Sequence, residues 1–104
     1  MVLASKKLGL LLSSAPDKPG FRHGLALAET ALRNGVQVYM YCIDEAVLGL
    51  ENPTLQSLQR QGVNLFACAY GAQKRNIAIN ELATFAGLSV LSDLVSATDR
   101  FVCF

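Results

Sequence analysis

The hydrophobic residues of this chain fall into compact runs that alternate with segments of helical periodicity. Residues 6–13 form the first run, closed by a turn rich in serine and proline, and a continuous apolar run of this length is typical of a strand buried on both faces. From about Phe21 the apolar positions recur at helical spacing up to Gly35, where a helix C-cap is expected. Residues 36–42 are rich in β-forming side chains, so they predict a second strand and complete a βαβ unit.

The middle of the chain continues this alternation. Residues 44–50 predict a short helical turn, and Asn52 then precedes a proline in the manner of an N-cap before the first helical position. Gly62 is expected to end that helix. Residues 63–67 predict the third buried strand, with Cys68 at its carboxyl end.

The last third of the chain is less regular. Residues 69–75 predict a short helix closed by Asn76, a residue type that tolerates the left-handed conformation, whereas residues 77–87 carry no clear pattern. Ser89 is the expected N-cap of a final helix, and residues 100–104 predict a final strand. Strands that alternate with helices predict an α/β fold, with three layers and a doubly wound, mostly parallel sheet of about five strands.

Composition adds an expectation about assembly. A chain of 104 residues is expected to form a single domain, residues 1–104, and its 52% of apolar and 16% of charged residues exclude disorder. In a domain this small, such a high share of apolar residues predicts that part of the surface is buried in an oligomer. Nine basic against eight acidic residues give a formal charge of +1 without a basic cluster, so neither nucleic-acid nor membrane binding is expected.

Cysteine and histidine usage narrows the chemistry further. Three dispersed cysteines and one histidine offer no spacing typical of a metal site, and an odd number of cysteines favours free thiols in a reducing compartment. The opening apolar run is shorter than a signal peptide requires, and no run approaches the roughly 18 residues of a membrane span. We therefore expect a cytoplasmic protein.

The candidate site lies where the predicted strands end. In open parallel sheets, ligands and reactive groups gather beyond the carboxyl ends of the strands. Ser13 and Ser14 follow the first strand, Cys42 and Asp44 the second, and Cys68 the third. The loop after the first strand lacks the glycine spacing of a nucleotide-binding loop, so nucleotide binding is not expected.

Cys68 is the strongest of these candidates. A thiol between a strand and a helix faces the unpaired N–H groups of the helix, which favour a thiolate. Tyr70 and Arg75 are expected at the rim of a shallow depression around it, as an apolar wall and a fixed positive charge. A small buried hydrophobe is the alternative reading of Cys68, because free cysteines are among the most buried residues; position alone leaves both open.

The other two cysteines are expected to be structural. In a 2-1-3 strand order Cys42 would lie two strands from Cys68, roughly 10 Å at ~4.8 Å per strand, which exceeds the reach of a disulfide. Asp44 would also discourage a thiolate at Cys42, so we predict a structural or pocket-lining role for it. Cys103 stands between two apolar residues of the last strand and is expected to pack.

Two longer segments resemble a known family. The stretch GVNLFACAYGAQKRN, in which Cys68 ends an apolar strand and Arg75 follows seven positions later, is similar to the active-cysteine segment of the DsrE/DsrF/TusD-like sulfur-relay proteins. The ending GLSVLSDLVSATDRFVCF is similar to their closing pattern. The helix ending ALRNG and the strand YMYCIDEAV also fit, so the resemblance spans nearly the whole chain.

The resemblance implies a DsrE-like or TusD-like subunit that forms a homotrimer or hexamer, or a hetero-oligomer with related subunits. It implies a sulfurtransferase-like role in which Cys68 accepts sulfur as a persulfide from a donor protein and passes it to an acceptor, with no organic cofactor. The sequence departs from many relatives in having Asn76 where they have glycine. The alternative from a different class is a noncatalytic oligomeric binding module of the same fold, with Cys68 lining a pocket for a small ligand or partner.

Overall fold

A five-stranded parallel sheet forms the centre of the computed structural model, which describes residues 5–104. The elements in chain order are β1 (Lys7–Leu12), α1 (Pro19–Arg33), β2 (Gln37–Cys42), the 3₁₀ helix η1 (Asp44–Gly49), α2 (Pro53–Arg60), β3 (Asn64–Cys68), α3 (Ala69–Lys74), β4 (Thr84–Ala86), α4 (Leu88–Ala97) and β5 (Arg100–Cys103). The α/β class and the parallel sheet are therefore confirmed. None of the helices in this described part of the chain is long and apolar enough to cross a membrane.

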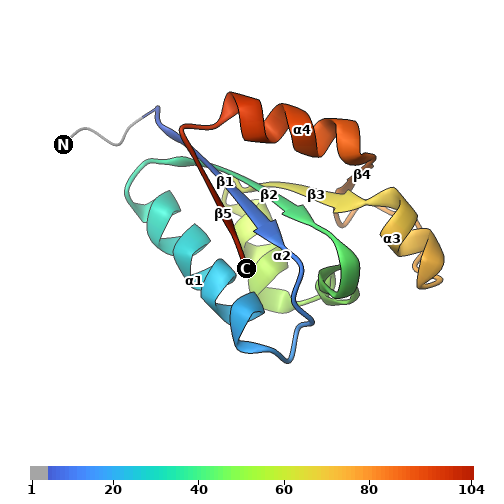
Figure 1. The fold of residues 1–104 in the computed structure, drawn as a ribbon. Helices are drawn as coiled ribbons and strands as arrows, with labels where there is room; N and C mark the ends of the chain where they lie inside the picture. The colour runs from blue at the N-terminus through green and yellow to red at the C-terminus, as the bar shows by residue number, and fades with distance from the viewer. Residues whose placement is uncertain (1–4) are drawn as a thin grey trace.

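The strand order is β4-β3-β2-β1-β5, and every pair is parallel. The first four strands advance in one direction across the sheet, and the last returns to the far side of β1. Because crossovers between parallel strands are right-handed, the change of direction places α4 on the face opposite α1 and α2, which Figure 1 shows as two helical layers around the sheet. The predicted doubly wound arrangement of three layers is thus confirmed.

The predicted 2-1-3 order is wrong. β2 lies between β1 and β3, and Cys42 is the register partner of Ala67. Consecutive strands of a chain are neighbours more often than not, and here that tendency holds from β1 through β4. Cys42 and Cys68 consequently belong to adjacent strands.

Most element boundaries follow from local chemistry. Pro19 takes the first helical position of α1, which therefore begins two residues before the expected Phe21. The side chain of Asn52 caps α2 as predicted, accepting the N–H groups of Thr54 at 2.9 Å and Leu55 at 3.1 Å. Asn76 follows α3 in the left-handed conformation, with φ of 57°.

The segment without a clear pattern contains the short edge strand β4. Its three residues are too few to show a sequence period, so the strand is recognisable only from its pairing with β3. α4 then begins at Leu88 with Gly87 as its N-cap, so the prediction that Ser89 caps this helix is wrong. Because β4 ends one residue earlier, at Ala86, the chain turns directly into the helix through the glycine.

Two clusters of buried side chains occupy the two faces of the sheet. The larger one joins the sheet to α1 and α2, and it includes Leu10, Phe21, Met40, Cys42 and Leu55. The smaller one lies under α4 and consists of Tyr41, Cys68 and Leu94, with partly buried neighbours around them. The candidate cysteine therefore lies on the more thinly covered face.

Candidate functional site

Cys68 occupies the junction between β3 and α3. It is the last residue of the strand and the N-cap of the helix, and its sulfur accepts a hydrogen bond from the N–H of Gly71 at 3.3 Å. The residue keeps 5% of its surface exposed, so the sulfur is enclosed rather than open to solvent. A backbone donor directed at sulfur stabilises the anionic form of a thiol more than the neutral form.

Tyr41 is the polar side chain that shares the buried cluster of Cys68. Its hydroxyl donates to the carbonyl oxygen of Ala86 at 3.0 Å, and Ala86 is the register partner of Cys68. Burial raises the pKa of Tyr41, and interaction with the neighbouring Cys68 raises it further. Tyr41 cannot be recognised from the sequence as a neighbour of Cys68, because a strand buried on both faces carries no period that tells which side chains face the cysteine.

Arg75 holds α3 against η1. One guanidinium nitrogen donates to the carbonyl oxygen of Gly71 at 3.3 Å, and the other contacts the Glu45 carboxylate at 2.8 Å. The same peptide residue, Gly71, thus accepts from Arg75 through its carbonyl oxygen and donates to the Cys68 sulfur through its N–H. The positive charge expected at the rim is partly neutralised by Glu45, an interaction between residues 30 positions apart that spacing in the sequence does not reveal.

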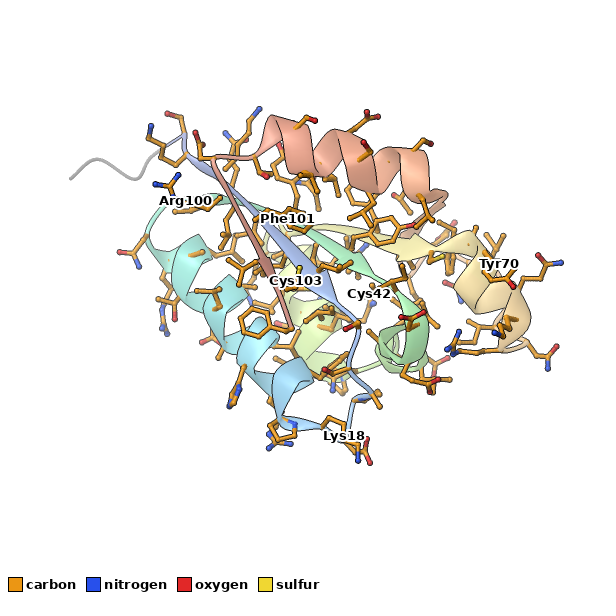
Figure 2. All side chains as sticks on the ribbon, viewed as in Figure 1. Lys18, Cys42, Tyr70, Arg100, Phe101 and Cys103 are labelled. Carbon is orange, nitrogen blue, oxygen red and sulfur yellow. The ribbon has the colours of Figure 1, made fainter. Side chains whose placement is uncertain are left out.

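Tyr70 does not form the apolar wall that was expected beside the sulfur. Its side chain is 70% exposed. Figure 2 shows it on α3 at the periphery of the molecule. In a helix that starts at Ala69, Tyr70 is the second residue and points away from the sheet, whereas Gly71 and Ala72 are buried.

The two serines are separated from Cys68 by a strand, whereas Asp44 begins the 3₁₀ helix η1, which packs beside α3. Ser13 donates through its hydroxyl to the carbonyl oxygen of Phe104 at 3.1 Å and so ties the carboxyl ends of β1 and β5 together. Ser14 follows it, and both come after β1, which β2 separates from β3. Asp44 is exposed at the start of η1. The serines are therefore not neighbours of Cys68, while Asp44 precedes Glu45, which reaches α3 through Arg75.

Cys42 and Cys68 face opposite sides of the sheet. Cys42 is paired with Ala67, and successive side chains of a strand alternate between faces, so the Cys42 thiol lies in the cluster under α1 and α2. It is completely buried, and burial raises its pKa from 9.0 to about 12. The predicted direction is the same, but the cause is desolvation rather than the charge of Asp44.

Cys103 is exposed, so the expectation that it packs in the interior is wrong. It belongs to β5, which has only one neighbouring strand and lies at the edge of the sheet. All three cysteines are free thiols. Within residues 5–104 no three His, Cys, Asp or Glu side chains come together as a metal site would require.

Two surface hollows lie elsewhere. One of about 350 Å³ lies between α1 and α2, next to Arg22, Glu29 and Asn52. The other, of about 240 Å³, lies between η1 and the loop that precedes β4. Cys68 lines neither of them.

The parallel sheet, its two helical layers and the cysteine at the end of β3 define a doubly wound α/β protein with a thiol at the carboxyl edge of the sheet. The sequence model of the DsrE/DsrF-like family matches residues 6–104, so the chain belongs to this family. Its fold is similar to that of the YchN protein from E. coli, with a TM-score of 0.77 and 14% identity over 96% of this chain and 99% of the other. No curated protein matches the chain in sequence.

Proposed function

We propose that this chain is a small sulfur-relay subunit in which Cys68 accepts sulfur as a persulfide and passes it on. The observation that carries the proposal is the hydrogen bond from the Gly71 N–H to the Cys68 sulfur, at the end of β3 in a member of the DsrE/DsrF-like family. Sulfur transfer uses a thiolate, and this donor favours one. The sulfur is carried on the cysteine itself, so the reaction needs no organic cofactor.

The transfer is redox-neutral at every step. The Cys68 thiolate attacks the outer sulfur of a donor persulfide, a bond forms between the two sulfurs, and the donor leaves as a thiolate when its own S–S bond breaks. An acceptor thiolate then attacks the outer sulfur of the Cys68 persulfide. The new bond forms on the acceptor, the bond to Cys68 breaks, and Cys68 is released as a thiolate. No external oxidant or reductant is consumed.

Mass spectrometry after incubation with a small-molecule persulfide donor tests this function. The wild-type protein is expected to gain the mass of one sulfur atom, located on Cys68 and removed by a reducing thiol. Cys68→Ser is expected to lose this uptake, and Cys103→Ser to keep it, since Cys103 is an exposed thiol on the edge strand β5. Sulfur found on Cys103 with none on Cys68 would contradict the proposal.

The burial of Cys68 favours a second candidate. With 5% exposure and a place in the cluster of Tyr41 and Leu94, the thiol has the surroundings of a packed side chain. The chain would then be a noncatalytic binding module of the same fold. The same loading experiment separates the two functions, because a packed thiol is expected to take up no sulfur from a donor that labels Cys103.

The partners belong to the proposal as well. The donor and acceptor proteins would bind at the end of the sheet where α3 lies. The protein would act in the reducing cytoplasm. Assembly as a homotrimer or hexamer, or with related subunits, is supported by large apolar side chains exposed on the surface, with Leu88 at 59% and Val95 at 51% on α4. Subunit contacts along α4 would cover these side chains on the face that holds Cys68.

A further inference from the structure

Tyr41 reaches Cys68 from the neighbouring strand. In the parallel register Tyr41 is paired with Phe66, two residues before Cys68, so both side chains lie on the α4 face of the sheet. The Tyr41 hydroxyl contacts Ala86 of β4, the register partner of Cys68 on the far side of β3. The phenol ring therefore crosses β3 at the level of the cysteine.

Burying the Tyr41 hydroxyl costs free energy unless the hydroxyl forms hydrogen bonds. Tyr41 is completely buried, and phenylalanine would fill the same space without a polar atom. Burial and the interaction with Cys68 both raise the pKa of Tyr41, so the phenol stays protonated and remains a donor while a thiol next to it ionises.

We propose that Tyr41 is a positioning residue for the sulfur of Cys68, which its hydroxyl holds by hydrogen bonding whenever Cys68 is a thiolate. While Cys68 is a thiol, the hydroxyl donates to the Ala86 carbonyl. When the sulfur becomes an anion, the O–H turns about its C–O bond and donates to the sulfur, because a charged acceptor forms the stronger hydrogen bond. The ring itself does not move.

Together with the Gly71 N–H, the Tyr41 hydroxyl gives the sulfur two donors from different elements, β2 and α3. The biological use of this arrangement rests on the proposed function. In sulfur transfer the Cys68 thiolate is the nucleophile of the first step and the leaving group of the second, so the same two donors would assist both.

Few ionisable groups compete with Tyr41 around the sulfur. Tyr39 of the same strand also packs against the cluster, but its hydroxyl donates to Gln37. From α4 the cluster receives Val90, Leu91 and Leu94, which are apolar. Arg75 of α3 and Glu45 of η1 pair with each other at 2.8 Å, on the carbonyl side of Gly71. β4 contributes the backbone carbonyl of Ala86. A change in the ionisation of Cys68 after removal of the Tyr41 hydroxyl would thus report on that hydroxyl.

The test compares the alkylation of Cys68 by iodoacetamide, as a function of pH, in the wild-type protein and in Tyr41→Phe. Loss of a hydrogen bond to a charged acceptor is expected to move the midpoint of the rate profile up by about one pH unit, which slows the reaction about tenfold at neutral pH. Tyr39→Phe is the matched control, because it removes a hydroxyl from the same strand and face that contacts Gln37 instead. Its profile is expected to match the wild type.

An unchanged profile in Tyr41→Phe would overturn the inference, and so would faster alkylation, which would show that Tyr41 merely shields the thiol. Should Tyr41→Phe fail to fold, a ring-fluorinated tyrosine at position 41 keeps the ring and hydroxyl but donates more strongly. It is expected to move the midpoint down, and no movement would overturn the inference.

The outcome is independent of sulfur uptake. A wild-type protein that takes up no sulfur but shows the Tyr41-dependent shift would reject the proposed function alone. Sulfur uptake with equal alkylation profiles would reject the role of Tyr41 alone.

Discussion

At the scale of single residues, the two buried cysteines show how much one position along a strand changes a thiol. Cys42 and Cys68 end adjacent strands, yet they face opposite sides of the sheet and meet different surroundings. The sulfur of Cys68 receives a backbone hydrogen bond, whereas Cys42 lies among apolar side chains that raise its pKa to about 12. The same chemical group therefore has a hydrogen-bond donor at its sulfur on one face and purely apolar surroundings on the other.

The raised pKa of Cys42 predicts a loss of stability at alkaline pH. Unfolding returns the thiol to its ordinary value of 9.0, so above pH 9 the unfolded state releases a proton that the folded state keeps until about pH 12. The contribution of Cys42 to the free energy of unfolding, fully present below pH 9, is expected to decline by about 2 kcal/mol by about pH 10.5. Urea denaturation, carried out once below pH 9 and once at about pH 10.5, measures this decline.

Cys42→Ala is expected to show a smaller decline, whereas Cys103→Ala, which alters an exposed thiol, is expected to retain all of it. Tyr41, whose pKa is also raised in the folded protein, contributes equally to the decline in both variants and so does not affect the comparison. Equal declines in the two variants would contradict the prediction.

At the scale of elements, the short helix α3 brings the donor to the sulfur and fixes its direction. The N–H of Gly71 points to Cys68, and its carbonyl oxygen accepts from Arg75, which in turn pairs with Glu45 of η1. The ion pair is partly exposed, so its own contribution to stability is small. Its effect is to orient α3, and with it the peptide group beside Cys68.

Gly71→Pro is expected to remove the backbone donor and, because the proline Cδ takes the place of the amide hydrogen that points at the sulfur, to displace the Cys68 side chain from α3. Gly71 lies in the first turn, where N–H groups have no partner within the helix and proline is tolerated. Without the donor, alkylation of Cys68 at neutral pH is expected to slow by about tenfold. Gly71→Ala is the control, because a methyl group there would make only ordinary contacts, 3.5 Å from the Cys68 Cβ and 3.7 Å from both its sulfur and an Arg75 guanidinium nitrogen, and the N–H remains. Equal rates in the two variants would show that the hydrogen bond does not govern reactivity.

At the scale of the whole molecule, the two faces of the sheet are covered unequally. α1 and α2 bury the larger cluster, whereas within residues 5–104 the face of Cys68 is covered by α4, whose buried side chain is Leu94. Figure 1 shows α4 as a single helix along that side of the sheet. An uneven distribution of this kind is expected where a second subunit completes the cover.

Sedimentation equilibrium at micromolar concentration is expected to show an assembly of three or six chains. Replacing both Leu88 and Val95 with glutamate places charges on the exposed side of α4 and is expected to shift the protein toward a monomer, because a buried unpaired charge is costly. Leu48→Glu, at a side chain of η1 that is 50% exposed, is the control and is expected to leave the mass unchanged. A monomeric wild-type protein would contradict the prediction.

The order of strands and helices could be predicted from the sequence, because each of these elements is specified by residues that are neighbours in the chain. Buried strands appear as apolar runs, Asn52 and Gly35 mark helix ends, and Cys68 stands directly between a strand and a helix. The three-residue strand β4 was missed because its pairing with β3, rather than its composition, makes it a strand.

The sequence by itself determined the α/β class, the parallel sheet and the position of Cys68 at the end of its strand. Only the tertiary structure decided the strand order, the faces to which the two cysteines belong, and the contacts of Tyr41 with Ala86 and of Arg75 with Glu45. The physical reason is that both faces of this sheet are covered. The strands β1, β2 and β3 are apolar on both sides, so the face of each of their side chains depends on register between segments distant in the chain.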